Sequence, residues 1–258
     1  MSGSNNKPAS KGLVIVTGGS RGIGRSTCLL LASHGYDVVI NYRSDRDAAE
    51  QVKNTILSDP GTYSGKPLVV KADVAVEEEV EAMFAAVTTH FGRNPTGLVN
   101  NAGILGEWHV TDVCEMKASD LDKIMAVNVY GPLYCIKSFV KLASKKRGGN
   151  GGAIVNVSSG SAHIGRPLLY ATSKGALDSM MVGLSKTLPL EGIRINAVKP
   201  GMTETDMVSQ GMLDSAMPNI PMQRAGRPEE IAEVIYWLLS ECSSYCSGAN
   251  IRAAGGRP

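Results

Sequence analysis

The sequence of 258 residues predicts a single doubly wound α/β domain with a parallel sheet of about seven strands. Short, continuous apolar runs recur along the chain, which is typical of strands buried on both faces of a parallel sheet. Segments with apolar residues at helical spacing separate these runs. Strands that alternate with helices predict right-handed crossovers and helices on both faces of the sheet.

The expected strands follow one another with helices between them. They are Gly12–Thr17, Asp37–Tyr42, Pro67–Lys71, Gly97–Asn100, Gly152–Val157, Arg194–Lys199 and a weak last strand at Ala249–Ala253. One helix runs from the first glycine turn to about His34, another begins near Val76, and a third covers Pro228–Ser240. The last of these opens with Pro, Glu and Glu, which are favoured in a first helical turn.

The chain shows no repeat and no linker that marks a second domain. Residues 1–11 have no apolar core, so we expect a short disordered leader rather than a secretory signal, followed by one domain over residues 12–258. The segment Met202–Pro221 is irregular and rich in Met, Thr and Ser. Because ligands of such folds bind beyond the carboxyl ends of the strands, this segment is a candidate substrate lid.

Composition excludes several classes of protein. The 26 Lys+Arg against 24 Asp+Glu give a formal charge of +2, which argues against nucleic acid as the main partner. No uncharged apolar stretch approaches the ~18 residues of a membrane span. The five cysteines are odd in number and fit neither a CxxC pair nor a zinc site, so we expect free thiols, no metal and a cytoplasmic location.

A glycine-rich turn directly follows the first strand, with the sequence TGGSRGIG at Thr17–Gly24. Such a turn before a helix points backbone N–H groups at an anion, and its glycines let a pyrophosphate approach the main chain. A carboxylate that ends the second strand holds the ribose of NAD in many dinucleotide sites. Here Tyr42, Arg43 and Ser44 stand at that point, and Arg21 lies in the turn. The two arginines suit a 2′-phosphate, so NADP(H) is preferred over NAD(H).

Tyr170 and Lys174 are four residues apart, on one face of an expected helix. Free tyrosine has a pKa of about 10, and a neighbouring ammonium with an oxidised nicotinamide favours the phenolate and lowers that pKa. A serine hydroxyl can hold a substrate oxygen during hydride transfer. This pair alone is weak evidence, but the glycine turn and the NNAG at Asn100–Gly103 strengthen it.

From Gly12 to Gly256 the chain resembles the short-chain dehydrogenase/reductase family, which has a Rossmann fold. The matching motifs are TGGSRGIG, Ala72-Asp73-Val74, NNAG, Asn128 with Gly131, NVSS at Asn156–Ser159, YATSK at Tyr170–Lys174, Pro200-Gly201, and the segment Pro221–Ser240. The sequence looks most similar to bacterial 3-oxoacyl-carrier-protein reductases and glucose 1-dehydrogenases.

The resemblance implies a role for each matching residue. Tyr170 is the acid–base residue, Lys174 binds the nicotinamide ribose and tunes Tyr170, Ser159 orients the substrate carbonyl, and Asn128 holds a water. The cofactor contacts implied by the turn, the strand end and the family are Gly18, Ser20, Arg21, Gly22, Ile23, Gly24, Tyr42, Arg43, Ser44, Asp73, Val74, Asn101, Ala102, Gly103, Tyr170, Lys174, Pro200, Gly201, Thr203 and Thr205.

Two departures from the family leave alternatives open. The interval from Ser159 to Tyr170 is shorter than usual, so Ser158 or Ser161 competes with Ser159 for the functional hydroxyl. Thr203 replaces a branched apolar residue and changes the expected carboxamide contact.

The resemblance implies an oxidoreductase that interconverts a carbonyl and a secondary alcohol, with a 3-oxoacyl thioester or a sugar or small ketone as substrate. The alternative is a non-catalytic NADP(H)-binding redox sensor. The family also implies a homotetramer or dimer that packs through the Tyr170 helix and a helix at about Ala118–Ser144.

Overall fold

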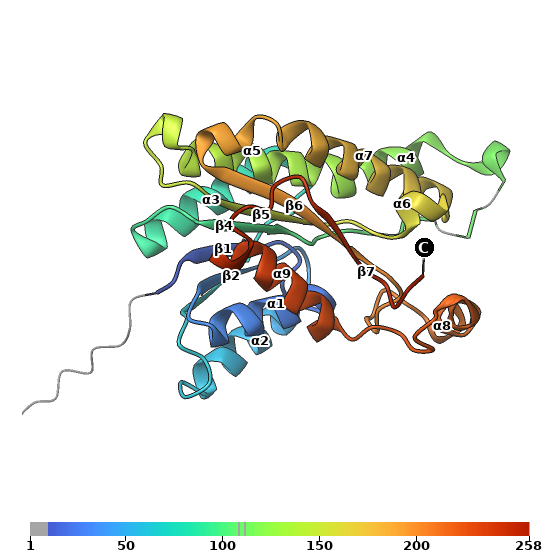
Figure 1. The fold of residues 1–258 in the computed structure, drawn as a ribbon, viewed down its shortest axis with the longest axis horizontal. Coiled ribbons are helices and arrows are strands. Elements are labelled where there is room, and N and C mark those ends of the chain that lie inside the picture. The colour runs from blue at the N-terminus through green and yellow to red at the C-terminus, as the bar shows by residue number, and fades with distance from the viewer. Residues whose placement is uncertain (1–9, 108, 111, 258) are drawn as a thin grey trace, which may run out of the picture.

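Seven parallel strands form one sheet in the order β3-β2-β1-β4-β5-β6-β7 (Figure 1). The computed structural model describes residues 10–257 apart from 108 and 111. The strands are β1 (Leu13–Val16), β2 (Asp37–Tyr42), β3 (Pro67–Lys71), β4 (Gly97–Asn100), β5 (Gly152–Val157), β6 (Ile193–Pro200) and β7 (Asn250–Ala253). The predicted fold class is confirmed. The strand order reverses between β1 and β4, and a ligand crevice lies at such a reversal, beyond the carboxyl ends of the strands.

Helices cover both faces of this sheet (Figure 1). One face carries α1 (Gly22–Ser33), α2 (Arg46–Ser58) and α9 (Pro228–Leu239), and the other carries α3 (Glu77–Phe91), α4 (Ala118–Met125), α5 (Gly131–Ala143) and α7 (Leu168–Leu184). Two smaller helices, α6 (Ser161–Ile164) and α8 (Gln210–Ala216), lie near the carboxyl edge. Short 3-10 turns lie at Val113–Glu115, Lys145–Arg147, Leu188–Glu191, Met217–Asn219 and Glu241–Ser243.

Successive residues of β1 enter different cores. Leu13 and Ile15 pack beneath α3, α5 and α7, whereas Val14 and Val16 pack against α1 and α9. Successive side chains of a strand point to opposite faces, so a strand covered on both sides needs an apolar residue at every position. This double burial explains the continuous apolar runs of the sequence.

The single helix expected at about Ala118–Ser144 is interrupted. Between α4 and α5 the chain forms a π-helical segment over Ala126–Tyr130, and Pro132 follows in the first turn of α5. Proline has no N–H to donate to the carbonyl four residues earlier, here that of Asn128, so the regular helical hydrogen bonds stop there. The wider turn places Asn128 in the interior, where its side chain is fully buried.

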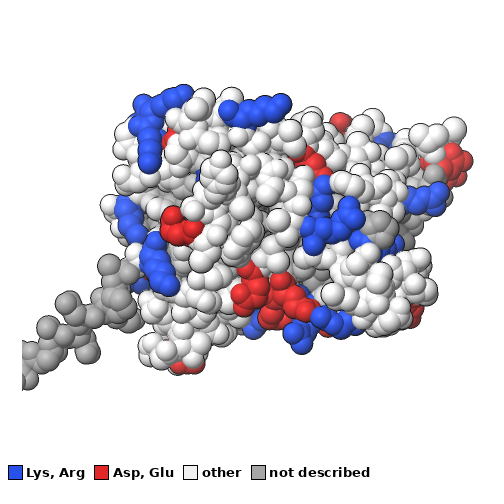
Figure 2. All heavy atoms as spheres, in the orientation of Figure 1, with Lys and Arg blue, Asp and Glu red and all other residues white. Residues whose placement is uncertain are grey.

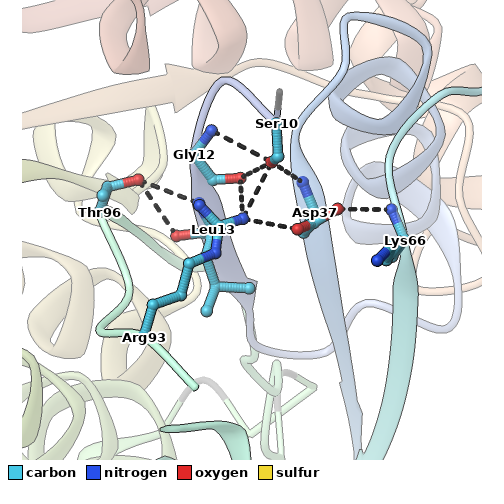
Figure 3. Close-up of polar contacts among 7 residues, drawn as sticks. All are labelled: Ser10, Gly12, Leu13, Asp37, Lys66, Arg93 and Thr96. Carbon is cyan, nitrogen blue, oxygen red and sulfur yellow. Dashed lines mark hydrogen bonds and ion pairs between the residues drawn. The ribbon is translucent and has the colours of Figure 1, made fainter. Parts of the chain in front are cut away.

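The amino ends of the strands are joined by a network of polar contacts (Figure 3). Asp37 accepts hydrogen bonds from the Arg93 guanidinium and, at 2.7 Å, from the backbone N–H of Lys66. Arg93 also donates to the Ser10 hydroxyl at 2.9 Å, and Lys11 donates its backbone N–H to Gly35. The expected leader over residues 1–11 lies mostly outside the described residues, and its last two residues belong to this network.

On the face shown in Figure 2, basic side chains lie in several separate groups, and acidic side chains gather near the lower centre. The helices within residues 10–257 include none with the length and apolarity that crossing a bilayer demands. All five cysteines are free thiols. The cytoplasmic location stays a prediction.

Candidate active site

A cavity of about 1400 Å³ opens beyond the carboxyl ends of the strands. Every cofactor or catalytic residue predicted from the sequence lines it, except Gly24 and Asn128. Those two lie directly behind its wall, in α1 and in the π-helical segment. Ligand pockets for drug-sized molecules measure about 300–1000 Å³, so this cavity has room for a dinucleotide together with a small substrate.

The glycine turn has the backbone shape that an anion site needs. Gly18 and Gly22 have φ values of +61° and +49°, which favour glycine. A side chain at Gly24 would place its Cβ 2.2 Å from the Gly18 carbonyl oxygen, so only glycine lets α1 begin this close to the turn. The Arg21 side chain does not cap α1, and the first N–H groups of the helix therefore face the cavity. This cradle fits a pyrophosphate.

The NNAG segment holds the glycine turn in place. The Asn101 side-chain amide donates to the carbonyls of Thr17 and Gly18 at 2.9 and 3.0 Å. The Thr17 hydroxyl accepts from the backbone N–H groups of Asn101 and Ala102. Since the Asn101 amide N–H groups are directed at the protein, its side chain shapes the turn, and Ala102 and Gly103 form the adjoining cavity wall.

Basic and acidic groups meet at the end of β2. Arg43 is more than half exposed and lies 4.0 Å from Asp73, and Arg21 lines the same cavity. Asp45 also borders this end, which the sequence reading missed because it sought a carboxylate only at the strand end itself. Asn41, which the sequence reading also missed, accepts from the Gly18 N–H through its side chain and from the Gly19 N–H through its carbonyl.

Tyr170, Lys174 and Ser159 all line the cavity. The Lys174 ammonium donates to the Val157 carbonyl at 2.8 Å and lies 5.6 Å from the centre of the Tyr170 ring. The Tyr170 hydroxyl is hydrogen-bonded with Ser159, and this bond lowers the pKa of Tyr170. Helix α7 therefore presents Tyr170 and Lys174 one turn apart, as the spacing predicts.

Burial changes the acid–base properties of this group. Desolvation raises the pKa of Tyr170 above its ordinary value, and the Ser159 hydrogen bond only partly opposes that rise. The lowering that the sequence reading expected from Lys174 together with an oxidised nicotinamide stays a prediction. Desolvation lowers the pKa of Lys174 to about 8, while Asp178 acts in the opposite direction.

The structure separates the three candidate serines. Ser159 lines the cavity next to Tyr170, and its hydroxyl accepts from the Ser161 N–H at 3.1 Å. Ser161 also lines the cavity, at the start of α6. Unlike Ser159, it is not among the groups that shift the pKa of Tyr170. Ser158 also borders the cavity, but it is buried, and its hydroxyl has no hydrogen-bond partner. Ser159 is the serine that contacts Tyr170.

Asn128 braces the wall behind the tyrosine. Its side-chain oxygen accepts from the Ile104 N–H at 2.9 Å, and its amide nitrogen donates to the Ile104 carbonyl and to the Ser173 hydroxyl. The side-chain amide is thus occupied by protein groups. Its implied contact with a water stays a prediction.

The segment after β6 closes the other side of the cavity. Pro200, Gly201, Thr203 and Thr205 all line it. The Thr203 hydroxyl donates to the Gly201 carbonyl at 3.1 Å, so it is not free to point outward. The sequence reading missed Arg257, which also borders the cavity and carries no motif. Within the described ranges, no three His, Cys, Asp or Glu side chains gather in a way that would hold a metal ion.

Comparisons with known proteins agree with this architecture. A family model described as enoyl-(acyl carrier protein) reductase matches residues 18–257. The chain is 44% identical to "Uncharacterized oxidoreductase YgfF" of Escherichia coli, over 95% of this chain and 99% of that protein. It is 33% identical to a 3-oxoacyl-[acyl-carrier-protein] reductase of Synechocystis, over 95% and 96% of the two chains. It is 34% identical to glucose 1-dehydrogenase 2 of Bacillus subtilis, over 94% and 93%.

A solved structure gives the same result. A short-chain dehydrogenase/reductase of Serratia marcescens superposes with a TM-score of 0.86 at 30% identity, covering 96% of this chain and 98% of that one. The fold and the site define a nicotinamide-dependent oxidoreductase. The chain belongs to the short-chain dehydrogenase/reductase family.

Proposed function

We propose that the protein is an NADP(H)-dependent oxidoreductase that interconverts a carbonyl and a secondary alcohol, with Tyr170 as acid and base. The observation that supports this function is the meeting of Tyr170, Ser159 and Lys174 in the cavity that also holds the glycine turn. When bound, the nicotinamide supplies the hydride.

The side chains divide the remaining work between them. The Tyr170 hydroxyl donates its proton to the carbonyl oxygen in reduction, and the phenolate takes it back in oxidation. Ser159 donates a hydrogen bond to the same oxygen and holds it beside Tyr170. The Lys174 ammonium binds the ribose of the cofactor and stabilises the phenolate, which offsets the effect of burial on the tyrosine.

Tyr170→Phe tests this assignment and separates an enzyme from a redox sensor. Removing the proton donor should lower kcat at least 100-fold, because general acid–base catalysis contributes about 10²–10⁴-fold. NADPH affinity, measured by fluorescence quenching, should change little. Turnover that survives the substitution would reject Tyr170 as the acid. Tight NADPH binding without turnover on any tested carbonyl would favour the sensor.

Arg43 and Arg21 support the preference for NADP(H). Both side chains line the cavity, and Arg43 directly follows the end of β2. Charge-assisted hydrogen bonds from such arginines suit a 2′-phosphate. Arg43→Ala should therefore raise the Kd of NADPH by about tenfold or more, which is ~1.4 kcal/mol, and leave that of NADH nearly unchanged. Arg46→Ala, also an exposed arginine but outside the cavity lining, is the matched control. Equal losses for both cofactors would contradict the assignment.

The proposed substrate is a 3-oxoacyl thioester or a sugar or small ketone. The segment Met202–Pro221, which we propose acts as a lid, contributes Met207, Val208 and Met212 to the cavity wall. Arg166 and Arg257 line the same cavity. Apolar and basic groups together suit an acyl chain with an anionic carrier. A panel of 3-oxoacyl thioesters, diketones and aldoses, followed by NADP(H) absorbance, distinguishes the two substrate classes.

We also propose a homotetramer or dimer formed through α5 and α7. Leu133 of α5 and Val182 of α7 are each more than 40% exposed. Apolar side chains exposed on neighbouring helices are typical of an interface between subunits. Light scattering in solution gives the mass that tests it.

A further inference from the structure

A buried polar layer lies beneath α7 at the carboxyl ends of β4, β5 and β6. Ile193, Ile195 and Ala197 of β6 all enter the core beneath α7, so Lys199, two residues on, points to the same face. Its ammonium lies 2.7 Å from the carboxylate of Asp178 on α7. The Lys199 side chain is 5% exposed and that of Asp178 14% exposed, so both charges are largely out of water.

Unpaired polar atoms are concentrated in this layer. Among the described residues, four buried side-chain atoms have no hydrogen-bond partner, namely Asn100 Oδ1, Asn156 Nδ2, Ser158 Oγ and Asp178 Oδ1. All four come from the carboxyl ends of β4 and β5 or from α7. An unpaired buried polar group costs about 1–3 kcal/mol. Their concentration beside one site points to a role other than stability.

Asp178 lies one helical turn beyond Lys174, on the same face of α7. Lys174 is buried, and the hydrogen-bond acceptor of its ammonium is the neutral carbonyl of Val157. The carboxylate that acts on it is that of Asp178, which raises the pKa of Lys174 against the larger lowering by burial. Lys199 holds one oxygen of that carboxylate, and the other oxygen, Oδ1, is unpaired.

The other elements packed on α7 bring charges only at the surface. Helix α4 carries Asp120, Asp122 and Lys123, and α6 carries His163; each is exposed or half-exposed. Solvent screens charges at such positions. The Tyr170 ring is the remaining titratable group near the Lys174 ammonium.

We propose that Asp178, held in place by Lys199, is a positioning residue that keeps the buried Lys174 ammonium protonated and directed at the site. The inference rests on the proposed function, in which Lys174 acts on Tyr170 and the cofactor ribose. Asp178 supplies the negative charge that a buried lysine needs, without competing for the ammonium's place in the cavity. Lys199 weakens the effect of that negative charge on Lys174, because its own ammonium is paired with the same carboxylate.

The two partners should therefore shift the titration of Lys174 in opposite directions. Asp178→Asn removes the negative charge and leaves Lys199 as a second buried cation, so the midpoint should fall by about one pH unit or more. Lys199→Met removes the competing cation and should raise it. Asp178→Glu keeps the charge and should restore most of the wild-type midpoint. A merely structural role for the pair does not predict shifts of opposite sign.

The measurement is a pH titration of the protein labelled with ¹³C at lysine Cε, followed by NMR, with the Lys174 signal assigned from its loss in Lys174→Met. It needs no substrate. If Asp178→Asn does not fold, the double variant Asp178→Asn/Lys199→Met replaces it. In the double variant the buried Lys199 ammonium, which would have lost its carboxylate partner, is removed as well. The Lys174 midpoint should then be lower in the double variant than in Lys199→Met, which differs from it only by the Asp178 charge.

Equal Lys174 midpoints in Lys199→Met and in the double variant would overturn the proposal. Shifts of the same sign in Asp178→Asn and Lys199→Met would also overturn it. The alkaline limb of turnover should move with the NMR midpoint. A failed proposed function gives a different result: Tyr170→Phe keeps its turnover while the NMR shifts stand. The two failures are therefore distinguishable.

Discussion

The two ends of the parallel sheet treat their polar groups in opposite ways. At the amino end, Asp37 is paired through both carboxylate oxygens, with Lys66 and Arg93, and the Thr96 hydroxyl bonds the backbone of Leu13 (Figure 3). At the carboxyl end, four buried atoms have no partner, and Lys174 is buried against a neutral carbonyl. One sheet thus joins a fully paired end to an end with unmet hydrogen bonds.

The difference indicates that the carboxyl end is less stable than it could be, because its buried polar groups serve the site and are not all paired. Buried polar groups add stability when they are paired and cost stability when they are not. At the amino end, which lies away from the cavity, the polar groups bond to one another. The carboxyl end faces the cavity, where a buried ammonium and a raised tyrosine pKa are useful only when cofactor and substrate are present. Removing a buried polar group should therefore lower stability at the amino end and leave it unchanged or raise it at the carboxyl end.

The largest effect is expected at Lys174. Its folded pKa is about 8 against an ordinary 10.5, so the unfolded chain binds more protons between these values and stability rises with pH across that window. Below pH 8 the cost of burying the ammonium is fully present, up to ~3 kcal/mol. Lys174→Met should therefore be more stable than the wild type at pH 7, and the difference should shrink from pH 8 to 10.5.

Urea unfolding at several pH values measures this difference. Lys141→Met, which removes an exposed lysine of α5, is the control and should change stability by no more than about 0.5 kcal/mol at any pH. If Lys174→Met is less stable than the wild type at pH 7, the contrast between the two ends is wrong. Lys174 would then stabilise the fold, as the paired groups of the amino end do.

Sequence alone predicts the residues of the carboxyl end better than their energetics. The apolar runs give the seven strands because each strand is covered on both faces, and the glycine turn and YATSK place the cavity at the correct edge. Among the protein's own groups, desolvation raises the pKa of Tyr170, and this effect depends on packing that no motif contains.

Contacts between distant elements were also beyond the sequence. Asp178 and Lys199 lie on α7 and β6, and nothing in either segment indicates that they meet. The π-helical segment behind Asn128 was read as regular helix, since its apolar pattern is helical and only Pro132 hints at the break.

The second effect is expected at Asp37, with the opposite sign. Asp37→Ala removes the acceptor of the Lys66 N–H and the carboxylate that pairs with Arg93, so stability should fall by about 2 kcal/mol and Tm by roughly 6 °C. NADPH affinity should not change, because this network lies at the other end of the sheet from the cavity. Asp122→Ala, at an exposed position of α4, is the control. Calorimetry and NADPH titration measure the two quantities, and a loss below about 0.5 kcal/mol would show that the amino end does not provide the stability assigned to it.

The smallest effect comes from one hydroxyl removed at each end. Ser158→Ala deletes a buried hydroxyl without a partner, so stability should stay the same or rise slightly. Thr96→Val deletes a hydroxyl that accepts from the Leu13 N–H at 3.1 Å, so it should cost about 1 kcal/mol. Both variants remove one polar atom near the end of a strand, and urea unfolding compares them directly. Equal losses would mean that Ser158 has a partner of its own, such as an internal water, and the carboxyl end would then be better paired than its protein atoms alone indicate.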